Sequence, residues 1–214
     1  MSRTNSHRRR STLDPGSYRG SYGFIGGDLS LDFVNTISWR ETDRAHEWLS
    51  NYTNLLDWAM LAGTISSPRS KLLIKLADRH PVMANRVVAG AINLREALNV
   101  IVTSVARPGT PSSRQMAILN SHLSFALQQL NLARAHDAFL WAWRLDEPRL
   151  DEILWPVVWS ACNLLISERR NQIGQCEGCG WVFLDTTKNH SRRWCVMKDC
   201  GNRAKAHRYR LRHH

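Results

Sequence analysis

Four of the five cysteines in this 214-residue chain fall within its last forty residues and form two pairs. Cys176 and Cys179 are separated by two residues, Cys195 and Cys200 by four, and fifteen residues lie between the pairs. Zinc takes four soft or borderline ligands in a tetrahedron, and a Cys-x-x-Cys turn supplies two thiolates from one tight loop. Glycines on both sides of Cys179 give that turn backbone freedom. The spacing predicts one structural Zn²⁺ held by all four cysteines.

Three other uses of the cysteines stay open at this point. Two disulfides would need an oxidising compartment, for which the chain carries no secretory signal. A redox Cys-x-x-Cys normally sits at a strand-to-helix turn of a βαβ unit and needs no second pair. In a Cys₃His site, His190 or His207 would replace one cysteine. The two-pair spacing favours the Cys₄ site over all three.

The residues around the cysteines predict a small local fold. Residues 181–184, Trp-Val-Phe-Leu, are typical of a short strand, and residues 185–191 of a turn. Residues 202–212 are basic and have helical character. A knuckle, a short hairpin and a last ligand at the start of a helix resemble a treble-clef finger.

The same residues carry a family resemblance. The tetrapeptide CGNR at 200–203, RRWC at 192–195 and the pattern CxxCGWxFxD at 176–185 together resemble the CGNR zinc finger, a bacterial family. Val196 stands where the family more usually has a small polar residue. The run GGDLSLDFVNT at 26–36 resembles the start of the helical ABATE domain, which commonly precedes this finger. The resemblance covers the chain from about residue 24 onward and implies a stress-induced transcription regulator.

Nearly all of the formal net charge of +11 lies at the two ends of the chain. From Cys176 onward, nine lysines and arginines face three acidic residues, a net of +6. The first 22 residues carry five arginines and one aspartate, a net of +4, and the part between is close to neutral at +1. A neutral body with basic ends indicates a polyanionic partner.

The basic segment after Cys200 is the predicted nucleic-acid contact, because a zinc module that presents a basic helix can offer side chains to a major groove. A helix would place Lys205, Arg208 and Arg212 on one side, while Ala204 and Leu211 face the knuckle and hairpin. Two arginines beside Cys195 add a second basic cluster. The residues predicted to contact nucleic acid are Arg192, Arg193, Arg203, Lys205, Arg208, Arg210 and Arg212.

The body of the chain predicts a mainly α fold. Apolar residues recur at helical spacing near residues 51–63, 68–77, 81–105, 116–130 and 148–169, and the last of these helices should be buried on most sides. Residues 139–143 suggest a small strand or hairpin, and residues 24–39 fit a strand or a helix equally. We expect Asp32, Asn35 and Thr36 to form an internal hydrogen-bond network; a ligand pocket is the alternative.

The expected organisation is a disordered basic arm at 1–22, a helical ABATE-like domain at 23–170 and a CGNR-type finger at 171–214. Of the basic arm, the HRRR run at 7–10 is expected to be a solvated tail. The fifth cysteine, Cys162, lies on an apolar helix face and is expected to be a packed core thiol. No apolar run reaches the length of a membrane span, so the expected location is cytoplasmic.

These features lead to one main hypothesis and two alternatives. The main hypothesis is a bacterial transcription regulator that binds DNA through the finger, while the helical domain binds a small-molecule effector or holds a homodimer. The first alternative is a finger that binds an acidic protein partner; the second is an RNA-binding protein. No nucleotide-binding loop, zinc-protease motif or nucleophile elbow is present, and a closed Cys₄ site leaves no position for water, so we expect no catalysis.

Overall fold

The computed structural model describes residues 22–40, 42–107 and 109–213, and in this part of the chain the fold is mainly α, as predicted. The helices are α1 (Leu29–Val34), α2 (Tyr52–Leu61), α3 (Ser67–Arg79), α4 (Pro81–Ala106), α5 (Ser113–Leu127), α6 (Leu154–Ile166) and α7 (Asn202–His213). Three antiparallel two-stranded sheets pair β1 (Ile37–Ser38) with β2 (His46–Glu47), β3 (Leu130–Ala135) with β4 (Ala138–Trp143), and β5 (Ile173–Gln175) with β6 (Val182–Leu184). Short 3₁₀ segments η1 (Leu150–Ile153) and η2 (Glu168–Gln172) flank α6, and a π-helical turn η3 (Met197–Gly201) precedes α7.

The predicted helix boundaries correspond to residues that favour helix ends. Asn51 caps α2 by accepting a hydrogen bond from the Asn54 N–H at 2.9 Å. Gly63 follows α2 with a φ of +75°. Many helices end with a residue in this left-handed conformation, which glycine adopts without steric strain. Proline stands in the first turn of both α3 and α4, where its missing N–H is not needed.

The ambiguous segment 24–39 forms both kinds of structure in succession. Asp28 caps α1, because its carboxylate accepts hydrogen bonds from Ser30 N–H at 3.1 Å and from the Ser160 hydroxyl of α6 at 2.6 Å. Leu31 and Phe33 are then fully buried on a one-and-a-half-turn helix. The chain leaves α1 through Asn35 and continues as β1.

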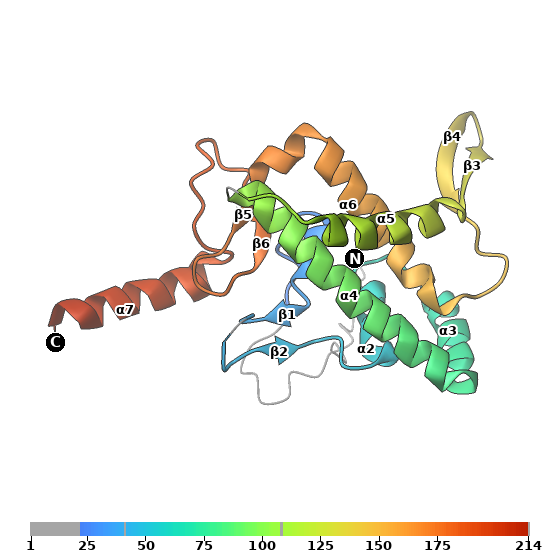
Figure 1. The fold of residues 1–214 in the computed structure, drawn as a ribbon, viewed down its shortest axis with the longest axis horizontal. Helices are drawn as coiled ribbons and strands as arrows, with labels where there is room; N and C mark the ends of the chain where they lie inside the picture. Colours follow the sequence, from blue (N-terminus) through green and yellow to red (C-terminus); the bar gives the residue numbers. More distant parts are fainter. Residues whose placement is uncertain (1–21, 41, 108, 214) are drawn as a thin grey trace, which may run out of the picture.

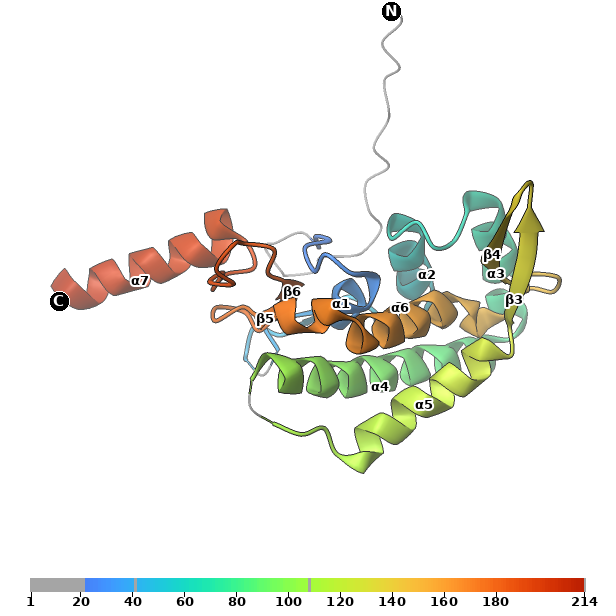
Figure 2. The same ribbon diagram turned by 90° about the horizontal axis from the view of Figure 1, so that it is seen from above.

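Helices α4, α5 and α6 form the body of the molecule, and α1 packs on it in contact with both α4 and α6 (Figures 1 and 2). The expectation that no apolar run reaches the length of a membrane span is wrong for α4, which is the one helix among the described residues that is long and apolar enough to cross a membrane. Its apolar face, which includes Val88, Leu94 and Leu98, is buried against these neighbours, as in the core helix of a globular domain.

Helix α6 is shorter and more open than the sequence indicates. Regular helix begins only at Leu154, after the 3₁₀ segment η1, so Pro156 falls in its first turn and causes no kink. The expectation that α6 is buried on most sides is wrong in part: Val157 and Leu164 are buried, but Ile166 is 80% exposed. Trp155, on the same side of the helix, is buried, so α6 is open mainly at its C-terminal end.

The predicted small hairpin is larger than residues 139–143. Strands β3 and β4 pair in a continuous register from Leu130 with Trp143 to Ala135 with Ala138, and they project from the body at the end of α5, on the side opposite to α7 (Figure 1). Trp143 packs near Trp155, with ring centroids 5.9 Å apart, whereas Trp141 is 59% exposed. Of these two hairpin tryptophans, only Trp143 therefore packs against the body.

The strands of the finger are built into the core of the helical domain. Ile173, Val182 and Leu184 belong to the same buried apolar cluster as the helices. The outer edge of β6 is paired with the N-terminal segment: the Leu184 N–H donates to the Gly26 carbonyl at 2.8 Å. On the same edge, the Asn35 side chain donates to the Val182 carbonyl and accepts from the Val182 N–H, both at 2.9 Å. The helical domain and the β5–β6 hairpin of the finger thus share a core, whereas Phe183 and three of the cysteines form a second buried cluster.

The predicted hydrogen-bond network of Asp32, Asn35 and Thr36 is confirmed. Besides the Asn35 contacts with β6, an Asp32 carboxylate oxygen accepts from the Gly26 N–H at 2.7 Å. The Thr36 hydroxyl donates to the Phe33 carbonyl at 2.7 Å, and all three side chains are buried. The network fixes the turn between α1 and β1, which positions the edge that receives β6.

The residues of the basic arm at 7–10 lie outside the described residues. Tyr22, the last residue assigned to that arm, belongs to the folded domain instead. Its hydroxyl donates to the Asp32 carbonyl and accepts from the Trp58 indole N–H at 3.0 Å. The charge pattern placed Tyr22 in the basic arm, but the contacts of its aromatic side chain place it in the folded domain.

The raised pKa of Asp32 predicts that the stability of the folded protein depends on pH. Burial raises its pKa to about 6, against the opposing hydrogen bonds from Gly26 and Ile25. The folded protein therefore binds a proton here more tightly than the unfolded chain, so this contribution to stability is complete below about pH 4 and is lost as the pH rises through about 6.

We expect Asp32→Asn to remove this loss. The free energy of unfolding of the variant, relative to wild type, should rise by on the order of 2 kcal/mol between pH 4 and pH 7. Urea denaturation at each pH measures it, and taking the difference between variant and wild type cancels protonation of the cysteines. Asp78→Asn, on the exposed face of α3, is the control with no expected change. A pH-independent difference for Asp32→Asn would contradict the assignment.

Candidate metal centre and basic helix

The four cysteines of the sequence prediction converge on one point. Their sulfur atoms all lie within 4.8 Å of one another. The Cys179 and Cys195 sulfurs are 3.5 Å apart, as are those of Cys195 and Cys200. Cys176, Cys195 and Cys200 are buried, and Cys179 is partly buried. No other group of three or more possible ligands of this kind occurs among the described residues.

The first cysteine pair lies on a tight knuckle. The Gly180 N–H donates to the Cys176 carbonyl at 3.0 Å, and the Cys176 N–H donates to the Trp181 carbonyl at 2.7 Å. Gly180 has a φ of +78°, so the conformational freedom expected of it is used. Gly178 is needed for space instead, because a Cβ there would lie 3.2 Å from the Cβ of Cys200.

The loop between the two pairs is held by a buried aspartate. Asp185 accepts hydrogen bonds from the Thr187 N–H at 2.9 Å, the Thr187 hydroxyl at 2.6 Å and the Arg192 N–H at 2.7 Å. Burial alone would raise the pKa of Asp185, but these hydrogen bonds outweigh it and lower the pKa. The ionised carboxylate fixes the predicted turn at 185–191, and this turn places Cys195 next to the other cysteines.

The two arginines beside Cys195 are engaged within the finger. The Arg192 guanidinium lies 4.1 Å from the Phe183 ring centroid and donates to the carbonyls of Trp194 and Cys195. Arg193 forms a two-pronged ion pair with Glu177, at 2.5 and 2.7 Å. Both arginines thus hold the loop that carries the second cysteine pair.

Arg203, the last residue of the CGNR tetrapeptide, joins the metal site to the helical domain. Its guanidinium donates to the Cys200 sulfur at 3.2 Å and pairs with Asp199 at 2.5 Å. The same group stacks 4.5 Å from the ring centroid of Trp39, which follows β1 with a φ of +56°. Burial lowers the pKa of Arg203, but its contacts with Cys200 and Asp199 outweigh this and raise it. Arg203 is a charged side chain held in place at the base of α7.

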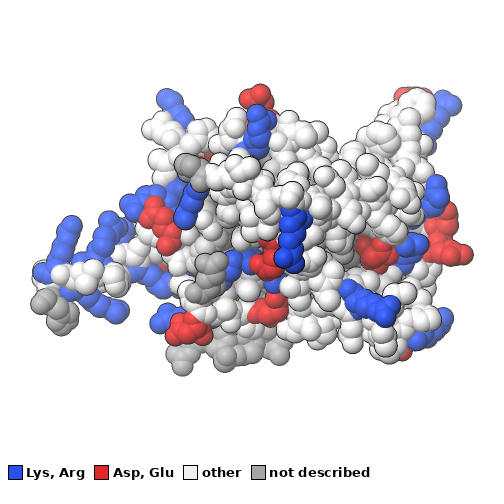
Figure 3. Space-filling model, viewed as in Figure 1, with Lys and Arg blue, Asp and Glu red and all other residues white. Residues whose placement is uncertain are grey.

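Helix α7 projects from the body, and no residue on it is buried (Figures 1 and 2). The other four predicted contact residues, Lys205, Arg208, Arg210 and Arg212, are all exposed along it. Lysines and arginines gather on this helix, whereas both signs of charge mix over the body (Figure 3). The expectation that Leu211 faces the knuckle is wrong, since it is 70% exposed. Beyond its first turn, α7 extends away from the finger (Figure 1), so Leu211 does not contact the knuckle.

Sequence reasoning missed the residues of the helical domain that hold the finger. Trp39 stacks on Arg203, and the Ile37 carbonyl accepts a hydrogen bond from the Trp181 indole at 2.9 Å. Neither residue belongs to a motif, and both lie more than 140 positions from their partners. The only sequence motif close to these two residues is the GGDLSLDFVNT run at 26–36, which directly precedes them.

The residues present fit a structural zinc ion. Four cysteine sulfurs are the donor set that Zn²⁺ prefers, and bonds of about 2.3 Å in a tetrahedron place neighbouring sulfurs about 3.8 Å apart, close to the separations observed. The Arg203 guanidinium partly balances the negative charge of the thiolates. The finger thus holds one structural zinc.

Comparisons with known proteins agree with this architecture. A model of the CGNR zinc finger matches residues 172–213. A model named ABATE, with the description "Putative stress-induced transcription regulator", matches residues 27–168, more than half of the chain. No curated protein matches the chain. Taken with the shared core and the Cys₄ site, these matches show that the chain belongs to the ABATE family and ends in a CGNR zinc finger.

Proposed function

We propose that the protein is a cytoplasmic transcription regulator that binds double-stranded DNA by inserting α7 into the major groove. The observation that carries this proposal is the exposed helix itself, with its cations and no buried residue. A helix made of 12 residues spans about 18 Å, and with side chains it is about as wide as the major groove, roughly 12 Å.

The distribution of charge around α7 supports a duplex partner. At 3.6 residues per turn, Lys205, Arg208 and Arg212 lie on one side, whereas Arg210 lies on the opposite side. A helix in a groove runs between two phosphate backbones, so cations on both sides meet phosphates. The edge between them carries Tyr209 and His213, and also Asn202, whose side-chain N–H donates to the Lys198 carbonyl at 3.1 Å and whose amide oxygen can accept a hydrogen bond from a base.

The finger gives this helix a fixed position. Zinc holds η3 through Cys200, and α7 begins two residues later. Arg203 then ties the first turn of α7 to Trp39 of the helical domain. Because Arg192, Arg193 and Arg203 have partners within the chain, the proposed phosphate contacts narrow to Lys205, Arg208, Arg210 and Arg212.

We also propose that the zinc is not catalytic. Four cysteine ligands fill a tetrahedral site and leave no position for water, so the metal has no activated nucleophile to supply. A metal-dependent hydrolytic activity of the pure protein that is lost in Cys179→Ser would contradict this proposal.

A double substitution on α7 tests the DNA contact. Lys205→Gln with Arg208→Gln should weaken binding to random duplex DNA by about tenfold or more at low salt and reduce the slope of log affinity against log salt by roughly 1 to 2. Fluorescence anisotropy of the zinc-loaded protein across a salt series measures both quantities.

The matched control changes the same charge elsewhere. Lys71→Gln with Lys75→Gln removes two exposed cations from α3 and should leave the salt slope unchanged. If both double variants weaken binding equally, the affinity for DNA depends on the net charge of the protein and not on α7. No binding of wild type at low salt, together with capture of an acidic protein that resists nuclease, would favour the protein-interaction hypothesis.

A further inference from the structure

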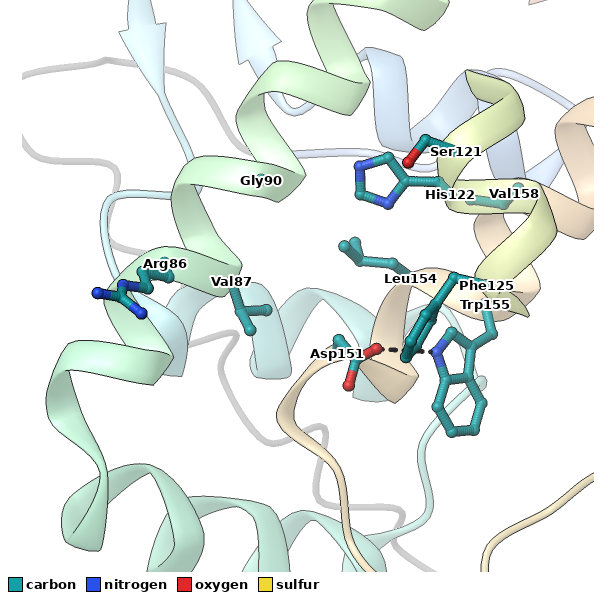
Figure 4. A pocket seen from close by; sticks show the side chains of 10 residues that line it. All are labelled: Arg86, Val87, Gly90, Ser121, His122, Phe125, Asp151, Leu154, Trp155 and Val158. Carbon is teal, nitrogen blue, oxygen red and sulfur yellow. Dashed lines mark hydrogen bonds between the residues drawn. The ribbon is translucent and has the colours of Figure 1, made fainter. Parts of the chain in front are cut away.

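Helices α4, α5 and α6 line an open pocket in the body of the molecule. Its volume is about 320 Å³, at the small end of the range for ligand pockets. Figure 4 shows side chains from all three helices, and from η1 before α6, turned toward this one space. Most of the lining is apolar, and Trp155 and Phe125 form one aromatic wall.

Gly90 keeps the pocket open. It lies in the middle of the 26-residue helix α4, where glycine costs on the order of 1 kcal/mol in helix propensity relative to alanine. A Cβ at this position would meet no atom within 4 Å, so close packing does not require the glycine. The missing side chain instead leaves room on the α4 side of the pocket.

The polar groups inside the pocket favour a hydrogen-bond donor or a cation. Asp151 offers a carboxylate, one oxygen of which accepts from the Trp155 indole N–H at 3.2 Å. Burial lowers the pKa of His122, against the opposing charge of Asp151, so the imidazole is neutral near pH 7. The one cationic lining residue, Arg86, is exposed, and solvent screens its charge.

The contacts of Arg149 show what kind of group Phe125 and Asp151 bind. The Arg149 guanidinium, a planar cation, lies 5.0 Å from the Phe125 ring centroid and 3.4 Å from an Asp151 carboxylate oxygen. Aromatic faces and a nearby carboxylate are the groups that recognise organic cations. Phe125 and Asp151 therefore form a site for a flat, positively charged group, which Arg149 occupies in this structure, so that a ligand cation bound on Asp151 takes the place of Arg149.

We propose that this pocket binds a small planar organic cation, such as an aromatic amidine or amine, with its charged nitrogen on Asp151 and its ring against Trp155 and Phe125. The proposal goes beyond DNA binding and concerns a separate site. Binding is measured without DNA, so that a failure here and a failure of the DNA-binding proposal are distinguishable.

Benzamidine, benzamide and benzoate test the proposal, because they share one shape and differ in charge. Benzamidine should bind the zinc-loaded protein about tenfold more tightly than either of the others. Two-dimensional amide NMR titration measures each affinity and should place the shifts on α4, α5 and η1. Equal or tighter binding of benzoate, or no shifts with benzamidine, would overturn the proposal.

Two variants locate the site. Gly90→Leu fills the pocket while favouring the helix, and it should abolish benzamidine binding; Ala89→Leu, exposed on the same helix, should not change it. Asp151→Asn should weaken benzamidine about tenfold and leave benzamide nearly unaffected. Binding that survives in Gly90→Leu, with the fold confirmed by its amide spectrum, would show that the cation binds elsewhere.

Discussion

Removing zinc is expected to unfold the finger beyond β6 and leave the helical domain folded. Chelation, or Cys179→Ser, takes away the ligand sphere that holds the knuckle, η3 and α7, and in small zinc modules metal binding supplies on the order of 10 kcal/mol of the folding free energy. Strands β5 and β6 should stay, because Val182 and Leu184 are buried in the helical core and hydrogen-bonded to the N-terminal segment.

Hydrogen exchange with mass spectrometry measures this outcome segment by segment. Amides of 195–213 should exchange freely after zinc is removed, whereas those of 173–175 and 182–184 should remain protected. Cys162→Ser changes a thiol outside the site and should keep one zinc per chain. Loss of protection throughout α4 and α6 would show instead that the whole fold depends on the metal.

Asn35→Ala is expected to cost about 4 kcal/mol of unfolding free energy. The substitution leaves the buried N–H and carbonyl of Val182 without partners, and each unsatisfied buried group costs on the order of 1 to 3 kcal/mol. The effect should appear in the helical domain as well as the finger, because Val182 lies in the shared core. Chemical denaturation monitored by circular dichroism measures it.

An exposed asparagine is the control. Asn163 on α6 donates to the Trp159 carbonyl within its own helix at 2.9 Å, so Asn163→Ala should change stability by no more than about 0.5 kcal/mol. If Asn35→Ala is equally mild, the hydrogen bonds to β6 do not hold finger and helical domain together.

Local patterns predicted the helices and the metal ligands well, because each signal lies within a few residues. Asn51 as a cap, Gly63 as a stop and the Cys-x-x-Cys knuckle act through their immediate neighbours. Helical spacing also gave α4, whose apolar face is long enough to be unambiguous.

Contacts between distant segments were beyond this reasoning. The sequence of α7 shows that it is basic and helical, but not that Leu211 points into solvent, since this depends on where η3 directs the helix. For the same reason Arg203 resembled a nucleic-acid contact, whereas its partners include Trp39, 164 positions earlier. The pocket behind Gly90 likewise arises only when three helices meet.

The pairing of β6 with the N-terminal segment limits how the finger can be exchanged between proteins. The two family matches separate between residues 168 and 172, yet the hydrogen bonds that β6 makes with Gly26 and Asn35 connect the two sides of that boundary. A chimera that transplants residues 172–213 alone would lose the partners of Val182 and Leu184. A working graft has to include residues 24–39 of the donor, so these two distant pieces of sequence form the exchangeable unit.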